Sequence, residues 1–349
     1  MTMTKVTDQI NSVTHQYISD NAQQFVYNAG KGIALMLDKA EVKYHGGKDS
    51  FYPYRSTGIS TNYYDGQYDG TIQSAITPVS TDLMDAAHQE GWSYWYKHEA
   101  STHGELVCNI SDTASVERAI SLSKLKADAL LDDVGYMFDQ NIANGDGTNN
   151  TILGLVKVMD ITNSNYLGWD FTGADAALAP KNTTIATSYT TLTMADLFEA
   201  YGGIEDAGRF ADTILAHPDV FKRLRTLSEN TVERTQGGNA SIGHLNFDVL
   251  GADIIPWRAM PTTTATKIYF LNFGNHVKLG VKGDSTPSVK EGSNWVLEIG
   301  GAKGDLGIKS TGWEDWTSNG YPGVMMNIMY GAFKLACTKP SDQAYISIA

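Results

Sequence analysis

The chain has 349 residues, of which 42% are hydrophobic and only 19% charged, and its formal net charge is −13. The apolar content suffices for a large core, whereas the acidic balance excludes a protein that binds nucleic-acid phosphates through lysine and arginine. The longest late stretch without charge, residues 316–333, is broken by polar residues and proline, which excludes a membrane span, and the N-terminus lacks the apolar run of a secretory signal.

Residues 1–45 are predicted to form a polar arm that leads into a short helix. The apolar residues that recur there at helical spacing are Phe25, Val26, Ala29, Ile33, Leu37 and Ala40. Gly30 and Gly32 interrupt this pattern and weaken the helix by roughly 1 kcal/mol each relative to alanine. We therefore expect the helix to be short.

Residues 46–101 are rich in aromatic side chains and poor in aliphatic ones, so they cannot form a core alone. Residues 92–98 predict a strand with Trp92, Tyr94 and Tyr96 on one face. We expect an extended loop that packs against another subunit, because tyrosine and tryptophan are enriched at buried interfaces. A carbohydrate-binding face formed by Trp92, Tyr94, Trp95 and Tyr96 is the alternative. The residues expected at the subunit interface are Tyr52, Tyr54, Tyr63, Tyr64, Tyr68, Trp92, Tyr94, Trp95 and Tyr96.

A long helix is predicted over residues 113–143, and the Asn-Gly-Asp-Gly sequence at 144–147 ends it. At 1.5 Å per residue its length would be roughly 45 Å, which is typical of a spine that crosses a whole domain. Its charged residues, including Asp132 and Asp139, are expected to lie mostly outside the apolar stripe. That stripe consists of Val116, Ile120, Ala127, Leu130, Val134, Phe138 and Ile142.

The second half of the chain alternates short helices and strands. Thr193 is expected to cap one helix, and Pro218 suits the first turn of another over residues 219–227. Residues 212–216 predict a buried strand between them, and the composition of residues 235–242 predicts a flexible loop. Further strands are expected at residues 247–250, 253–256, 268–273, 277–281, 295–299 and 324–336.

The chain lacks the G-x-S-x-G, G-x-x-x-x-G-K-[ST] and G-x-G-x-x-G motifs of nucleophile elbows, phosphate loops and dinucleotide sites. His98, Glu99 and His103 resemble a zinc helix, but a spacing of five residues turns the two imidazoles apart. Asp85 and His88 would share a helical face as metal ligands. A solvated helical turn with ordinary charge patterning is the favoured interpretation of that segment.

Two further groups of reactive residues also give no catalytic signal. Asp132 and Asp133 lie on the outer face of the predicted long helix, without the apolar cleft that separates the pKa values of a catalytic carboxylate pair. Cys108 and Cys337 lie in apolar, strand-like sequence, which favours inert core thiols, and two cysteines are too few for a disulfide framework. We therefore expect no enzyme, no cofactor and no metal site.

Five short sequences occur in an order that is typical of one known family. They are Gly145–Thr148 with Ile152–Gly154, Thr213–Pro218, Val249–Pro256 with Met260 and Pro261, Ile268–Phe273 with His276–Leu279, and Gly331–Leu335. Over about residues 110–340 this order resembles the major capsid proteins of tailed bacteriophages, which have the Hong Kong ninety-seven fold. Asn272 stands where that family frequently has aspartate.

The resemblance implies an α+β phage capsid fold, with an N-terminal arm, an extended loop, a long spine helix in a peripheral domain, and a mixed α/β axial domain. Gln236, Gly237, Gly238 and Asn239 are expected in a loop near the capsomer axis. The implied divisions are the arm and short helix at 1–45, the extended loop at 46–101, the peripheral domain at 102–155 and 265–349 with its spine helix at 113–143, and the axial domain at 156–264.

The implied function is that of a major capsid protein that assembles through hexamers and pentamers into an icosahedral head. An acidic wall suits a container for double-stranded DNA, because a basic one would hold the genome tightly. The expected partners are further copies of the chain, a separate scaffolding protein, a portal and decoration proteins. The expected location is the virion, after assembly in the cytoplasm of a bacterial host. Two alternatives stay open, an encapsulin-like nanocompartment shell and a carbohydrate-binding virion-surface protein.

Overall fold

The structure is a computed structural model. It describes residues 3–44, 49–54, 85–90, 93–102, 113–147, 151–173, 176–185, 188–205, 211–231, 247–249, 252–260, 266–274, 293–301, 306–316, 319–320 and 323–348. Its α-helices are α1 (Met3–Ala29), α2 (Lys31–Lys39), α4 (Thr113–Asn144), α5 (Leu155–Val158), α6 (Met194–Glu205) and α7 (Pro218–Thr231). Short 3-10 helices lie at Ala176–Leu178, Tyr189–Thr191 and Pro340–Asp342.

The strands are distributed over two large sheets and a separate hairpin. They are β1 (Glu41–Tyr44), β2 (Asp49–Tyr54), β3 (Asp85–Glu90), β4 (Ser93–Thr102), β5 (Lys181–Ile185), β6 (Thr213–Ala216), β7 (Phe247–Val249), β8 (Ala252–Pro256), β9 (Thr266–Leu271), β10 (Trp295–Ile299), β11 (Lys309–Asp315), β12 (Val324–Cys337) and β13 (Ala344–Ile348).

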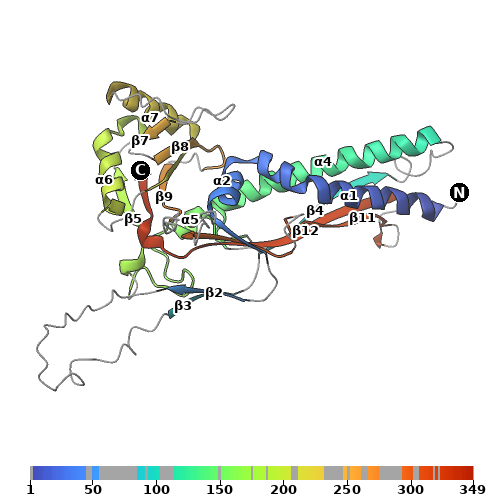
Figure 1. The fold of residues 1–349 in the computed structure, drawn as a ribbon, viewed down its shortest axis with the longest axis horizontal. Helices are drawn as coiled ribbons and strands as arrows, with labels where there is room; N and C mark the ends of the chain where they lie inside the picture. The colour runs from blue at the N-terminus through green and yellow to red at the C-terminus, as the bar shows by residue number, and fades with distance from the viewer. Residues whose placement is uncertain are drawn as a thin grey trace, which may run out of the picture.

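Two long helices, α1 and α4, lie side by side along the molecule (Figure 1). The predicted spine helix is confirmed by α4, but the predicted polar arm is wrong, because residues 3–29 form α1. Among the α1 residues whose side chains the structure describes, the buried ones come once every four positions and form a narrow stripe with a threonine in it, which explains why the sequence pattern was weak. They are Ile10, Thr14, Ile18 and Ala22.

The helical segment is interrupted at Gly30, which has an extended backbone with φ −153° and separates α1 from α2. The expected single short helix is therefore the second of two. Ile33 and Met36 of α2 are buried in the main hydrophobic core, together with Val134 and Ile142 of α4. Gly30, one of the two glycines that weakened the predicted helix, thus marks a real break, whereas Gly32 lies within α2.

The long strand β12 organises the first sheet, whose order is β1-β10-β12-β11, with β4 also paired to β12. Phe333 is opposite both Ile299 of β10 and Ser93 of β4, so β4 and β10 lie on opposite edges of β12. The helices α1 and α4 cover one face of this sheet (Figure 1). The strand predicted at residues 92–98 is confirmed as β4, but it belongs to this sheet and not to an extended loop.

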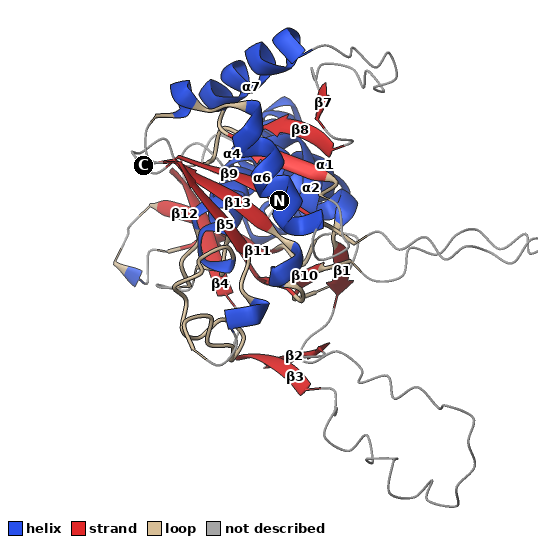
Figure 2. Cartoon of the chain, turned by 90° about the vertical axis from the view of Figure 1, so that its left-hand side faces the viewer, coloured by secondary structure: helices blue, strands red, loops and turns tan. Residues whose placement is uncertain are grey.

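The second sheet has the order β5-β13-β9-β6-β8-β7 and carries helices α6 and α7 (Figure 2). Thr193 caps α6 as expected, since its hydroxyl oxygen accepts from the backbone N–H of Asp196 at 3.4 Å and the Asp196 carboxylate accepts in return from the Thr193 N–H at 2.7 Å. The strand predicted at 212–216 is confirmed as the buried β6. This sheet and its helices enclose a second core that includes Ile214, Ile254 and Phe270.

The strands predicted at 247–250, 253–256, 268–273, 295–299 and 324–336 are confirmed as β7, β8, β9, β10 and β12. No strand was predicted at the positions of β1, β2, β11 and β13. The strand expected at 277–281 and the loop expected at 235–242 lie outside the described residues.

Strands β2 and β3 form an antiparallel hairpin that projects from the body of the molecule (Figure 2). The predicted helical turn around Asp85 and His88 is wrong, because both residues lie in β3. In the described residues, β2 and β3 pair only with each other.

Candidate assembly surface and domain junction

An exposed tyrosine face lies on the side of the first sheet away from α4. Tyr94 and Tyr96 of β4 are 65% and 71% exposed, and Tyr330 of β12 is 43% exposed. Tyr96 and Tyr330 are direct cross-strand partners, so their rings share one face of the sheet. We call Tyr94, Tyr96 and Tyr330 the tyrosine face. Tyrosine offers a large apolar ring with a hydroxyl at its end, which suits a surface that another protein covers.

Trp95 corrects part of the predicted interface. It is only 7% exposed, and its ring packs edge-on against Phe138 of α4 with centroids 5.3 Å apart. A side chain on Gly331 of β12 would lie 2.8 Å from the Trp95 ring, so the glycine makes room for it. Trp95 is therefore a core residue of its own subunit, and its predicted roles at a subunit interface or in carbohydrate binding are wrong.

The remaining predicted interface residues are not tested by the structure. Tyr52 and Tyr54 lie in β2, where only the backbone is described. The residues that lie outside the described residues are Tyr63, Tyr64, Tyr68 and Trp92 of the aromatic segment, and Gln236, Gly237, Gly238 and Asn239 of the expected axis loop.

Asp139 of α4 forms a buried polar junction that the sequence analysis did not anticipate. Its Oδ1 atom accepts hydrogen bonds from the backbone N–H groups of Gly32, at 2.8 Å, and Ile33, at 3.3 Å, at the start of α2. Its Oδ2 atom accepts one from the indole N–H of Trp257, at 2.8 Å. The expectation that Asp139 lies outside the buried stripe is wrong, because only 6% of it is exposed.

Two glycines make this junction sterically possible. A Cβ atom on Gly30 would lie 2.1 Å from Cγ of Asp139, and one on Gly32 would lie 2.0 Å from the Trp257 ring. Burial raises the pKa of Asp139, and the three hydrogen bonds oppose that rise. The glycine pair and an aspartate in a long apolar helix were visible in the sequence, but nothing there linked them to Trp257.

A second polar contact joins the end of α2 to the second sheet. The Nζ atom of Lys39 donates to the hydroxyl of Thr213 at 2.6 Å and lies 3.8 Å from a carboxylate oxygen of Asp253. Next to them, Asp212 accepts hydrogen bonds from the Thr213 hydroxyl and from the Phe273 N–H. Burial raises the pKa of Asp212, and the charge of Lys39 opposes this rise.

A buried amide network joins the two sheets. The side chain of Gln343 accepts from the Asn272 N–H at 2.8 Å and donates to the Asn272 carbonyl at 3.0 Å. It also accepts from the indole N–H of Trp295 at 3.3 Å, and Asn294 donates to the same Asn272 carbonyl at 3.2 Å. Because β9 and β13 belong to one sheet and β10 to the other, this network fixes the sheets against each other.

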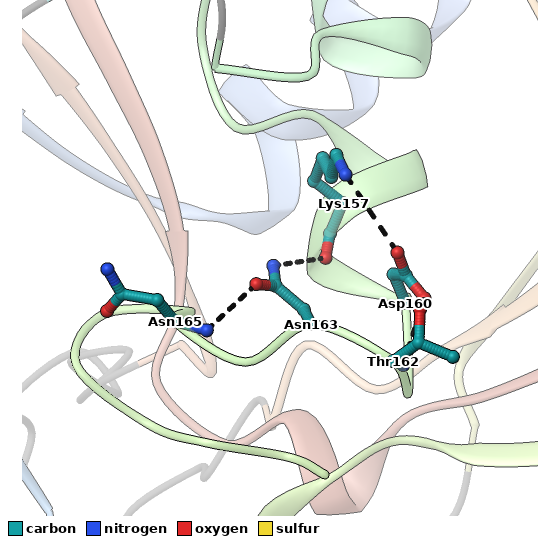
Figure 3. Close-up of polar contacts among 5 residues, drawn as sticks. All are labelled: Lys157, Asp160, Thr162, Asn163 and Asn165. Atoms are coloured by element: carbon teal, nitrogen blue, oxygen red, sulfur yellow. Dashed lines mark hydrogen bonds and ion pairs between the residues drawn. The ribbon is translucent and has the colours of Figure 1, made fainter.

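The polar loop after α5 is closed by its own side chains (Figure 3). Asp160 accepts from the N–H of Thr162 at 3.0 Å and lies 4.0 Å from Nζ of Lys157. Asn163 donates to the Lys157 carbonyl at 3.3 Å and accepts from the Asn165 N–H at 3.1 Å. Contacts of this kind are typical of a structural surface turn.

The other candidate metal ligands and the candidate nucleophile gain no support from their positions in the described structure. His98 lies in strand β4, and His103 lies outside the described residues. Burial raises the pKa of the Cys337 thiol, which makes it a poor nucleophile. Within the described part of the chain, no three His, Cys, Asp or Glu residues are grouped to hold a metal ion. Of the described helices, none is long and apolar enough to cross a membrane.

Solved capsid structures share this fold. The capsid of the native GTA particle superposes with a TM-score of 0.59 at 9% sequence identity, over 90% of this chain and 90% of that chain. The capsid of the empty GTA particle gives 0.54 at 10% identity, over 90% and 96%. The capsid of cyanophage A-1(L) gives 0.52 at 15% identity, over 91% and 92%. At these identities the likeness establishes the fold alone.

No curated protein matches the sequence significantly. The model of the phage capsid family, however, matches residues 105–288, which is more than half of the chain. This range includes the helices α4 to α7 and the strands β5 to β9. The chain therefore belongs to the phage capsid family and is a major capsid protein, a structural component of the virion that forms an icosahedral shell.

Proposed function

We propose that this capsid subunit assembles through hexamers and pentamers into a head that encloses double-stranded DNA, and that the tyrosine face is buried between neighbouring subunits. The observation that supports this assembly surface is the cross-strand pair of Tyr96 and Tyr330, both of which are exposed on a large sheet. The division into a peripheral domain at 102–155 and 265–349 and an axial domain at 156–264 is part of this proposal.

The energetics of the tyrosine face support its burial in an assembly. An aromatic side chain buries about 150–250 Å² when it is fully covered, and apolar burial contributes about 25 cal/mol per Å². Covering Tyr94, Tyr96 and Tyr330 would therefore contribute several kcal/mol per subunit before ordering costs. That gain is repeated at every copy of a symmetric contact in the shell.

The β2–β3 hairpin supports a contact between subunits in a second way. A two-stranded hairpin is at best marginally stable in water, and it normally needs a further strand or a packing surface. In the described residues β2 and β3 pair only with each other. We propose that a neighbouring subunit provides the missing packing surface, and that Tyr52 and Tyr54 of β2 contribute to this contact.

The rest of the proposal concerns partners and location. A formal charge of −13 favours a container that encloses DNA without binding its sequence. We propose a separate scaffolding protein, a portal and decoration proteins as partners, assembly in the cytoplasm of a bacterial host, and a purely structural role without catalysis. Gln236, Gly237, Gly238 and Asn239 are proposed to lie near the capsomer axis.

A charge placed in the tyrosine face tests the assembly surface. Tyr96→Asp should leave the subunit folded, with an unchanged melting temperature, but should prevent shell formation, because the contact would bury an unpaired carboxylate. Tyr96→Phe should assemble like the parent, since it keeps the ring. Sedimentation and electron microscopy of the purified proteins report the assembly state.

The matched control places the same charge on another exposed tyrosine. Tyr136 of α4 is 61% exposed and lies away from the tyrosine face, so Tyr136→Asp should assemble normally. Normal shells from Tyr96→Asp would overturn the proposed surface. Equal loss of assembly in both variants would show that the effect is not specific to the tyrosine face.

A further inference from the structure

The sequence contains two Asn-Gly pairs, Asn144–Gly145 and Asn319–Gly320. In such a pair the backbone nitrogen of the glycine can approach the asparagine side-chain carbon with little hindrance, because glycine has no Cβ atom and a wide choice of backbone angles. The structure places the two pairs in contrasting surroundings. The reactivity of the two pairs can therefore be compared within one chain.

The first pair is held in place on both sides. The side-chain amide of Asn144 donates to the Ala259 carbonyl at 2.8 Å, so its orientation is fixed. The N–H of Gly145 donates to the Asn141 carbonyl at 2.8 Å, and Gly145 is buried. Attack by this nitrogen on the Asn144 side chain would break the end of α4.

The second pair lies in the connection between β11 and β12, and both of its residues are exposed. The N–H of Asn319 donates to the Trp316 carbonyl at 2.9 Å. Gly320 has φ +85°, and a Cβ atom on it would have no neighbour within 4 Å. Among the described residues, no hydrogen bond holds the side-chain amide of Asn319 or the N–H of Gly320.

We propose that Asn319 is a site of spontaneous covalent modification, in which its side-chain amide becomes a carboxylate. The Gly320 nitrogen loses its proton to hydroxide and attacks Cγ of Asn319. The new N–Cγ bond closes a five-membered succinimide ring, and the Cγ–Nδ2 bond breaks with release of ammonia. Water then opens the ring at either carbonyl, which gives aspartate or isoaspartate and requires no oxidant, metal or enzyme.

The product changes the charge of this end of the sheet. Glu314 and Asp315, the last two residues of β11, are already exposed, and the modification adds another negative charge to the connection that follows them. The isoaspartate form also lengthens the backbone by one carbon at Asn319. Shells that age in solution should therefore carry a mixture of subunits that differ at this connection.

Mass spectrometry of the whole purified protein tests the proposal. The protein is held in mildly alkaline buffer, sampled over time and digested, and the conversion of amide to acid is located by fragmentation. We expect conversion at Asn319 through a transient succinimide, with loss of ammonia, and an intact amide at Asn144. In denaturant both residues should convert, because the contacts that protect Asn144 are then lost.

Two variants complete the test. Asn319→Gln should remove the modification and leave the melting temperature unchanged, and Gly320→Ala should slow it by crowding the attacking nitrogen. Conversion of Asn144 as fast as Asn319 in the folded protein would overturn the proposal. An amide at Asn319 that survives in the folded protein for as long as that of Asn144 would overturn it as well.

Discussion

The indole N–H of Trp257 donates a hydrogen bond of 2.8 Å to Oδ2 of Asp139, a residue 118 positions earlier in the chain. Trp257 follows strand β8 of the second sheet, whereas Asp139 lies near the end of α4. The other carboxylate oxygen holds the first N–H groups of α2. One buried carboxylate therefore fixes the break between α1 and α2, the spine helix and the end of β8.

Replacing Asp139 with asparagine should lower the free energy of unfolding by about 2–4 kcal/mol. Both carboxylate oxygens accept hydrogen bonds, so the amide NH₂ of an asparagine must face an N–H donor on one side. Thermal unfolding of the purified subunit measures the effect. Asp132→Asn, at an exposed position of the same helix, should melt like the parent. Equal melting temperatures for Asp139→Asn and the parent would contradict the junction.

The pH dependence of stability provides a separate test of Asp139. Burial raises its pKa, whereas an aspartate in an unfolded chain titrates near about 3.9. The folded state therefore binds the proton more tightly, and the stability contributed by this group falls as the pH rises through the folded pKa. Denaturant unfolding of the parent and of Asp139→Ala should show the parent gaining relative stability as the pH is lowered from neutral. A relative loss on acidification would contradict this sign.

Gly32→Ala should destabilise the subunit strongly, by about 3 kcal/mol or more, because its methyl group would overlap the Trp257 ring. Gly202→Ala is the matched control. Gly202 lies in α6, where a Cβ atom would meet nothing within 4 Å, so alanine should stabilise that helix by about 0.5–1 kcal/mol. Calorimetry of both variants checks the difference. A Gly32→Ala protein as stable as the parent would show that α2 and Trp257 are not in close contact.

Val134→Asp should unfold the subunit, because the side chain is fully buried between α4 and its neighbours, and an unpaired buried charge costs several kcal/mol. Ala129→Asp introduces the same charge at an exposed position of α4 and should be tolerated. Circular dichroism and solubility distinguish the two outcomes. A soluble Val134→Asp protein with the melting curve of the parent would remove the assignment of α4 as the buried spine.

Shortening the β2–β3 hairpin should separate folding from assembly. Tyr54 and Asp85 are direct partners in the hairpin, so an Asn-Gly turn in place of residues 55–84 can join them without a change of register. The shortened subunit should melt like the parent but form no shells, because Tyr63, Tyr64 and Tyr68 are proposed to contact a neighbour. Normal shells would place the required contacts elsewhere, while a loss of folding would show that the segment stabilises its own subunit.

The sequence predicted the elements whose apolar pattern is dense, and it failed where burial depends on distant partners. The stripe of α4 and the short buried strands β6 and β10 repeat apolar residues at the spacing of their element. By contrast, the buried face of α1 contains Thr14, whose hydroxyl is satisfied by the Ile10 carbonyl, so the residue can be buried without an apolar side chain. Residues 3–29 therefore looked polar.

The candidate surface was predicted only in part. Alternation along residues 92–98 correctly put Tyr94 and Tyr96 on one face, but it could not show that the opposite face, with Trp95, would be covered by α4. The role of Tyr330 depends on its pairing with Tyr96 across more than 200 residues, which no local pattern contains. The Asp139 junction was missed for the same reason, because its three donors come from two distant segments.

Negative-stain electron microscopy of the purified protein, alone and after co-expression with a candidate scaffolding protein, tests the central claim most directly. A subunit of the phage capsid family that assembles through the tyrosine face should form closed icosahedral shells or capsomer rings, and Tyr96→Asp should abolish them. Parent protein that stays monomeric under every condition, or Tyr96→Asp shells identical to those of the parent, would contradict the account.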